Sequence, residues 1–97
     1  MDILSWVEDW YKEHCNGVWE HDYGITIGTL DNPGWYVRIN LNGTSLLNKN
    51  FENIDLMVDD KNWIKCMKEN EEFKGFRDSH KLITILGYFK EFVLSEC

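Results

Sequence analysis

Proline, cysteine and basic side chains are all scarce in this 97-residue sequence, which contains one proline, three cysteines and seven glycines. Cys15, Cys66 and Cys97 form no Cys-x-x-Cys pair, and their odd number argues against a disulfide framework or a zinc ribbon. Reduced thiols are therefore the expected state, as is typical of cytoplasmic proteins.

Positive charge is in deficit. Ten Lys and Arg face seventeen Asp and Glu, which gives a net charge of −7. A nucleic-acid-binding protein needs cations to displace phosphate counterions, and an anionic membrane surface attracts basic segments. We therefore expect neither nucleic acid nor membrane as a partner. A negative protein is instead suited to a fast encounter with a basic one.

Long apolar runs and phosphate-binding loops are also missing. Asp2, Glu8 and Asp9 interrupt the N-terminal region, so we predict no signal peptide and no membrane-spanning helix, and we expect a cytoplasmic location. Gly24 and Gly28 fall in a predicted strand that no helix follows, which is unlike a nucleotide-binding loop. We predict no cofactor.

The residues that are present favour one globular domain over 1–97. Hydrophobic residues make up 43% of the chain and aromatic residues 14%. A chain of this length can bury a single core without disulfides or a structural metal. Each buried aromatic ring removes a large apolar area from water. Some of these rings could instead anchor a partner, because Trp and Tyr are enriched at interface hot spots.

Two strands and a tight turn are predicted over 19–41. Apolar residues alternate at positions 23, 25 and 27, and again at 35, 37, 39 and 41, which is the period of a strand with one buried face. Between these runs lies Asp31-Asn32-Pro33-Gly34. Proline before a glycine that accepts positive φ predicts a type II turn.

Helices are predicted at both ends of the chain. Asp2 caps the first helix, which covers about residues 3–15. Asp78 or Ser79 caps the last helix, in which Gly87 should be tolerated through close packing on a neighbouring element. The apolar stripe of this helix is Leu82, Ile85, Leu86, Phe89, Phe92 and Val93.

The middle of the chain supplies two more predicted strands. Residues 44–50 form an irregular connection, 51–58 a third strand and 63–67 a fourth, with polar turns at 59–62 and 69–72. Phe73 and Phe76 flank Gly75 and are expected to cover an edge of the core. The predicted fold is α+β: a four-stranded antiparallel sheet, arranged as a meander, with an N-terminal and a C-terminal helix packed on it.

Several titratable residues could suggest catalysis, but none forms a convincing constellation. Strand alternation places Glu20 and Asp22 on one face and His21 on the other, at the end of the core face. His14 and Cys15, as neighbours in a helix, point about 100° apart. A metal site would need several ligands without diagnostic spacing, from the set His14, Cys15, Glu20, His21, Cys66 and His80. We predict no catalytic residue and no metal.

A binding surface is the better-supported hypothesis. The outward face of the predicted hairpin carries Asp22, Thr26, Tyr36, Arg38 and Asn40, and it stays open if both helices cover the other face. Acidic runs surround the third strand and the turn at 69–72, at opposite ends of the fourth strand. A solvated surface would explain these charges equally well. The predicted partner-binding residues are Asp22, Asp31, Tyr36, Glu52, Asp55, Asp59 and Asp60.

The sequence resembles the immunity protein 53 family over nearly its whole length. The resemblance is carried first by Trp10-Tyr11, Cys15-Asn16-Gly17, Trp19-Glu20-His21, Tyr23-Gly24-Ile25 and Thr29-Leu30-Asp31-Asn32-Pro33-Gly34-Trp35. It continues through Gly43-Thr44, Phe51, Trp63, Cys66, Phe73, Gly75, Leu82, Ile85-Leu86 and Phe89. Arg77-Asp78-Ser79 departs from the family pattern.

This resemblance implies a small bacterial immunity protein, encoded beside a polymorphic toxin, that binds and neutralises its cognate toxin domain. It supplies no catalytic residues, because the family is a class of binding proteins. The toxin is expected to be basic and of nuclease type, and inhibition to be stoichiometric occlusion. Two alternatives stay open at this point: a small hydrolase that uses Glu20, His21 or His14, and a protein-interaction module unrelated to toxins.

Overall fold

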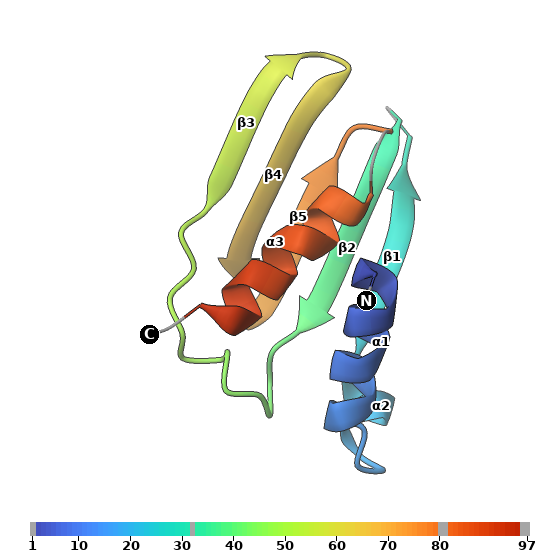
Figure 1. Ribbon diagram of the computed structural model, residues 1–97, viewed down its shortest axis with the longest axis vertical. Helices are drawn as coiled ribbons and strands as arrows, with labels where there is room; N and C mark the ends of the chain where they lie inside the picture. The colour runs from blue at the N-terminus through green and yellow to red at the C-terminus, as the bar shows by residue number, and fades with distance from the viewer. Residues whose placement is uncertain (1, 32, 80–81, 96–97) are drawn as a thin grey trace.

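The computed structural model describes residues 2–31, 33–79 and 82–95. Its elements run in the order α1 (Ile3–His14), α2 (Trp19–Asp22), β1 (Ile25–Leu30), β2 (Gly34–Asn40), β3 (Ile54–Asp59), β4 (Asn62–Glu69), β5 (Glu72–Arg77) and α3 (Ile83–Leu94) (Figure 1). The predicted α+β class, the antiparallel sheet and the helices near both ends are confirmed.

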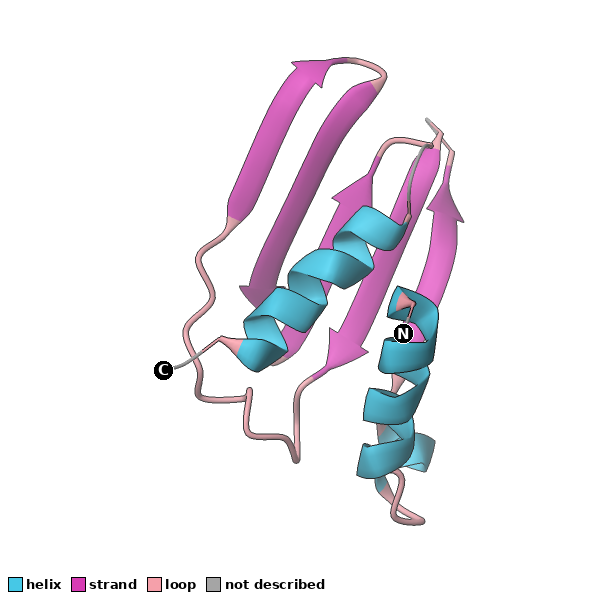
Figure 2. Cartoon of the chain, viewed as in Figure 1, coloured by secondary structure: helices cyan, strands magenta, loops and turns pink. Residues whose placement is uncertain are grey.

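The sheet has five strands in the order β1-β2-β5-β4-β3, so the predicted four-stranded meander is wrong (Figure 2). The missed strand is β5, which pairs with both β2 and β4 at the centre of the sheet. The apolar alternation of this strand is interrupted at Gly75. Phe73 faces the helices, and Gly75 shares this face but has no side chain. A Cβ at Gly75 would lie 2.2 Å from Cγ2 of Ile85 in α3, so glycine allows the helix to approach the strand.

The first strand begins later than predicted because residues 19–22 form the short helix α2. The Asn16 side chain accepts hydrogen bonds from the backbone N–H groups of Val18 and Trp19, both at 2.9 Å. Trp19 is buried, and its indole N–H donates to the carbonyl of Asn42 at 2.8 Å. His21 is exposed in α2 instead of lying at the end of a core strand face.

The β1–β2 hairpin is confirmed, since Leu30 pairs with Gly34, but its predicted type II turn is wrong. That turn requires positive φ at Gly34, and this glycine is in the ordinary negative-φ region. Its role is a close backbone approach: a Cβ there would lie 2.5 Å from the carbonyl oxygen of Arg77 in β5. Asn32, part of the predicted turn, lies outside the described residues.

Both long helices lie over the same face of the sheet, as predicted (Figure 1). The predicted Asp2 cap is confirmed, with its carboxylate accepting the N–H of Ser5 at 2.8 Å. Trp10 of α1 meets Phe89 of α3 edge-on at 4.9 Å between ring centroids, and Phe89 packs on Phe73 of β5 at 5.2 Å. These aromatic contacts join the two helices and the central strand into one core.

The predicted cap of the last helix is wrong, because α3 starts after Leu82 and has no side-chain cap. Asp78 is instead 2% exposed and faces β4. Its carboxylate accepts the backbone N–H of Trp63 at 2.9 Å and lies 3.9 Å from the Arg77 guanidinium. A buried carboxylate with these partners extends the β4–β5 pairing by one residue.

Gly87 has a different environment from the predicted one. A Cβ built on it would meet no atom within 4 Å, so no neighbouring element requires a glycine there. The close packing that explains the glycine of β5 is absent from this helix position.

Two lysines hold the connection between β2 and β3, which is irregular as predicted. The Lys68 ammonium donates to the carbonyls of Leu47 and Lys49 at 2.6 and 2.7 Å. The Lys49 ammonium donates to the carbonyls of Phe92 at 2.8 Å and of Ser95, at the C-terminus of α3. The Lys49 bonds satisfy carbonyls at the C-terminal end of α3, and the Lys68 bonds join the connection to β4.

Candidate partner-binding surface

Among the described residues, neither of the long helices α1 and α3 lies on the second face of the sheet (Figure 2). The register places Thr26 opposite Arg38 and Gly28 opposite Tyr36, while the intervening Val37 is fully buried on the helix side. The predicted outward direction of Thr26, Tyr36, Arg38 and Asn40 is therefore confirmed. Asp22 was expected in the same strand, but it lies in α2, from which it lines a hollow of about 540 Å³ together with Thr26, Arg38 and Asn40.

Tyr36 is held in place on this open face. A Cβ at Gly28 would be 2.5 Å from Cε1 of its ring, so the ring covers the glycine in the neighbouring strand. The Arg38 guanidinium lies 5.8 Å from the ring centroid, a cation–π contact. The half-buried ring is thus fixed before any partner arrives, which lowers the entropy cost of using it as an anchor.

A hollow of about 550 Å³ opens on the same face. Its lining comes from four strands and one turn: Leu30, Met57, Asp60, Trp63, Lys65 and Phe76. The hollow combines apolar side chains with one acid and one base, the composition of a small protein-binding pocket.

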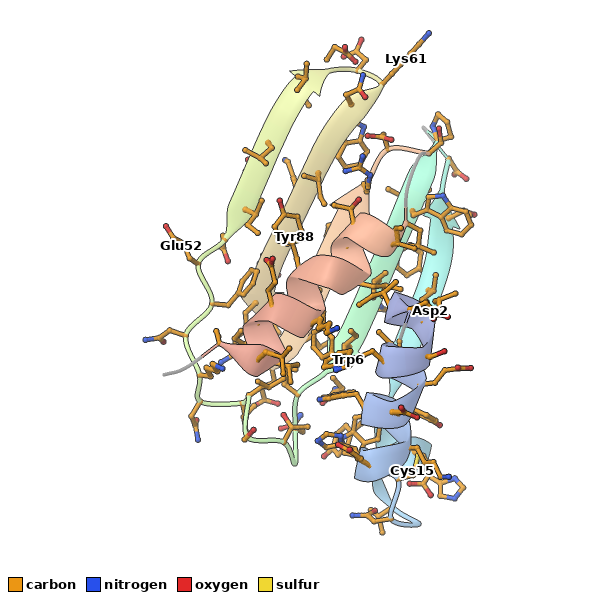
Figure 3. All side chains as sticks on the ribbon, in the orientation of Figure 1. Asp2, Trp6, Cys15, Glu52, Lys61 and Tyr88 are labelled. Atoms are coloured by element: carbon orange, nitrogen blue, oxygen red, sulfur yellow. The ribbon has the colours of Figure 1, made fainter. Side chains whose placement is uncertain are left out.

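The predicted acidic residues divide into separate groups. Glu52 lies just before β3 (Figure 3), Asp55 within it, Asp59 at its end and Asp60 in the following turn, and all are exposed. Asp31 is exposed in the β1–β2 connection. Asp59 also shapes the β3–β4 turn, because its carboxylate accepts the N–H of Lys61 at 2.8 Å.

Side chains that could have suggested catalysis form hydrogen bonds with backbone groups instead. The two Glu20 carboxylate oxygens accept the N–H groups of Asn16 and Gly17 at 2.9 and 2.8 Å. Hydrogen bonds from its own backbone N–H and from these two amides lower the pKa of Glu20. Glu20 thereby stabilises the turn between α1 and α2.

His14 and Cys15 also have structural partners. His14 Nδ1 lies 2.8 Å from the Trp10 carbonyl, and its ring packs against the Trp10 indole at a tilt of 36° with centroids 4.2 Å apart. The Cys15 thiol donates to the Tyr11 carbonyl at 3.3 Å. Neither side chain faces the other as a nucleophile and base would.

In the described part of the chain, no group of three or more His, Cys, Asp or Glu is placed to hold a metal ion. His80 and Cys97, both considered above, lie outside that part. Cys66 is fully buried between the sheet and α3, and burial raises the pKa of its thiol to about 12, against a smaller opposing effect of Arg77. Over the residues described, no helix has the length and apolar character needed to span a membrane.

One feature of the surface escaped sequence reasoning. Apolar residues alternate at Ile54, Leu56 and Val58, which is typical of a strand with one buried face, yet Leu56, Met57 and Val58 are 55%, 65% and 83% exposed. The strand lies at the edge of the sheet, beyond the reach of α3 (Figure 1). Only its position, which depends on the insertion of β5 between β2 and β4, reveals this exposure.

Fold and surface together define a small α+β protein that leaves one sheet face and an acidic edge strand accessible. The family model described as Immunity protein 53 matches residues 4–94, so the chain belongs to the immunity protein 53 family. The resemblance noted from the sequence is thereby confirmed. Searches of curated proteins and of solved structures find no significant match to the chain.

Proposed function

We propose that this protein binds the cognate toxin domain in a stoichiometric complex and neutralises it by covering its functional surface. Membership of an immunity protein family supports the class of function. The structural observation that carries the proposal is the acidic margin, defined as Glu52, Asp55, Asp59 and Asp60, all exposed along β3 and its flanks.

The acidic margin favours a basic partner, because it stays negative although Lys65 lies opposite Asp55 and Lys61 follows Asp60. Complementary potentials accelerate the encounter between proteins and disfavour wrong partners. A nuclease-type toxin fits this requirement, because an enzyme that acts on nucleic acid presents cations to phosphate. Tyr36, fixed on the open face beside the hollow, would add an aromatic anchor. Asp31 and Asp22, further from the margin, would contribute to steering.

We further propose that the protein acts by binding and not by turnover. Support comes from Glu20, His14 and Cys15, because both Glu20 carboxylate oxygens, His14 Nδ1 and the Cys15 thiol engage backbone groups. A side chain committed to stabilising a turn or a helix end is poorly placed to move protons on a substrate.

Co-expression with the toxin domain encoded beside this gene tests the proposal. We expect growth to be restored and the purified proteins to form a complex of one copy each by light scattering. If cells are not protected and the two proteins elute separately, the proposed function is wrong.

The acidic margin is tested by matched charge variants. Asp55→Asn with Asp60→Asn should slow association with the toxin severalfold at low salt. Asp9→Asn with Glu13→Gln removes the same charge from exposed positions of α1 and should leave the rate nearly unchanged. Equal rates for the two double variants would show that total charge, and not the margin, governs the encounter.

A further inference from the structure

Strand β3 ends the sheet on one side, because it is the last in the strand order and pairs only with β4 (Figure 1). Its three consecutive apolar residues at 56–58 are more than half exposed. An exposed apolar edge strand is normally avoided, because its free backbone groups template the pairing of another chain. The register of β3 shifts between Met57 and Asp59, so the regular part of the edge that could receive another strand is residues 54–57.

The contacts of Trp63 show which backbone groups of β3 are free. Its N–H donates to the Asp78 carboxylate at 2.9 Å and its carbonyl accepts the Asp78 N–H at 3.3 Å, so both groups point away from β3. Met57, opposite Trp63, therefore belongs to a non-hydrogen-bonded pair. The N–H and carbonyl groups of Met57, and by the strand period those of Asp55, point to the outer edge.

Hollows lie on both faces of the sheet beside these free groups. Met57 lines the 550 Å³ hollow on the open face. Leu56 and Val58 line a second hollow, of about 290 Å³, on the helix side. Tyr88 of α3 also lines the second hollow (Figure 3). A strand added to β3 would send alternate side chains to the two faces, beside both hollows.

We propose that the outer edge of β3 binds an extended basic segment of the toxin by strand addition, an inference that rests on the proposed function. Asp55 lies at one end of the exposed apolar stretch, and Asp59 and Asp60 lie at the other. The complementary segment therefore carries Lys or Arg at both ends of a short apolar stretch with β propensity. Backbone pairing supplies affinity, and the flanking charges select the partner.

The same charges disfavour a second copy of this chain. The register of β3 shifts between Met57 and Asp59, but an antiparallel pair of β3 strands would still bring the Asp55 end of each copy to the Asp59 and Asp60 end of the other. Like charges directly opposite each other destabilise a strand pair. The other edge strand, β1, has no charged residue between Ile25 and Leu30, so it offers a basic segment no such complement.

Met57→Pro tests the inference because it removes the outward N–H and leaves the pairing with β4 intact. Proline is tolerated on edge strands where the N–H faces solvent. Met57→Ala is the matched control, since it loses the side chain and keeps the donor. In the complex with the toxin domain encoded beside the gene, we expect Met57→Pro to weaken binding at least tenfold more than Met57→Ala. Equal binding by the two variants would overturn strand addition.

Hydrogen exchange of the wild-type complex tests the inference without a substitution. The amides of residues 55 and 57 should exchange quickly in the free protein and become strongly protected in the complex. A stable complex in which both amides still exchange quickly would overturn strand addition and leave the proposed function standing. If no complex forms, both fail. A dimer of this chain that protects the same amides would identify a second copy as the occupant and overturn the inference.

Discussion

The ring of Tyr36 in β2 lies on Gly28 in β1, where a Cβ would come within 2.5 Å of the ring. The two residues are directly opposed in the sheet, so the absence of a side chain at Gly28 leaves room for the Tyr36 ring to pack on the strand. An aromatic side chain that covers a cross-strand glycine stabilises that glycine and fixes its own rotamer. This relationship holds the predicted aromatic anchor in position on the open face.

Gly28→Ala should therefore have opposite effects in two backgrounds. In the wild type, the added methyl displaces the Tyr36 ring and lowers the free energy of unfolding by about 1 kcal/mol. In the Tyr36→Ala background the space is free, and the same change should stabilise by about 0.5–1 kcal/mol through the lower entropy of alanine in the unfolded chain. Urea unfolding of the four proteins measures this coupling. Identical effects in both backgrounds would contradict the proposed packing of the Tyr36 ring on Gly28.

Gly75→Ala should be more damaging, because the neighbouring Ile85 is fully buried and cannot swing into solvent. We expect a loss of about 1–3 kcal/mol in the free energy of unfolding, as for overpacking of a close-packed core. The Ile85→Leu background removes Cγ2, the atom 2.2 Å from the new Cβ, and should reduce the loss. Denaturant curves of both pairs test this, and a loss of equal size in each background would count against a local clash.

Gly87→Ala should stabilise the protein by about 1 kcal/mol, because alanine has the higher helix propensity and the Cβ meets no neighbour. In a domain of this size, that corresponds to a rise of roughly 4–8 °C in Tm. Gly24→Ala is a sharp control. Its Cβ also meets no atom within 4 Å, but Gly24 has φ +137°, so this change should destabilise. Calorimetry that gave both variants the same sign would refute the distinction.

The buried Cys66 thiol should make stability fall in alkali. Its pKa rises from an ordinary value of 9.0 to about 12 in the folded protein. Below pH 9 the thiol is protonated in both the folded and the unfolded protein, so its ionisation does not reduce the free energy of unfolding. Between pH 9 and 12 the unfolded chain ionises while the folded one does not, so the free energy of unfolding falls by up to about 1.4 kcal/mol per pH unit.

Urea unfolding at pH 8 and pH 10 measures this effect in the wild type and in Cys66→Ala. The wild type should lose more stability between the two pH values, because other groups that titrate in this range are common to both proteins. The same loss in the variant would assign the alkaline instability to residues other than Cys66.

The agreement between sequence and structure follows from the range of the interactions. The Asp2 cap, the first helix and the β1–β2 hairpin depend on neighbouring residues, and the pattern predicted each of them. The role of the turn residues was harder to predict from the sequence. Gly34 is needed because β5 approaches it closely, and not because it adopts a positive φ. Asp78 likewise resembles a cap locally but bonds to Trp63 across the sheet.

The candidate site was predictable in its charge but not in its shape. The acidic residues around 52–60 are visible in the sequence, as is the outward direction of Tyr36. Whether those acids border a free backbone edge depends on which strand ends the sheet, and that depends on β5, whose alternation is hidden by Gly75. Exposure of the apolar residues at 56–58 was therefore not deducible from their own pattern.

The sequence by itself determined the α+β class, the negative charge, the amphipathic helices and the resemblance to an immunity protein family, because these are properties of composition and of short-range periodicity. Only the tertiary structure decided that β5 enters the centre of the sheet and leaves β3 at its edge. Strand order results from contacts between residues far apart in the chain, and such contacts leave no regular spacing along it.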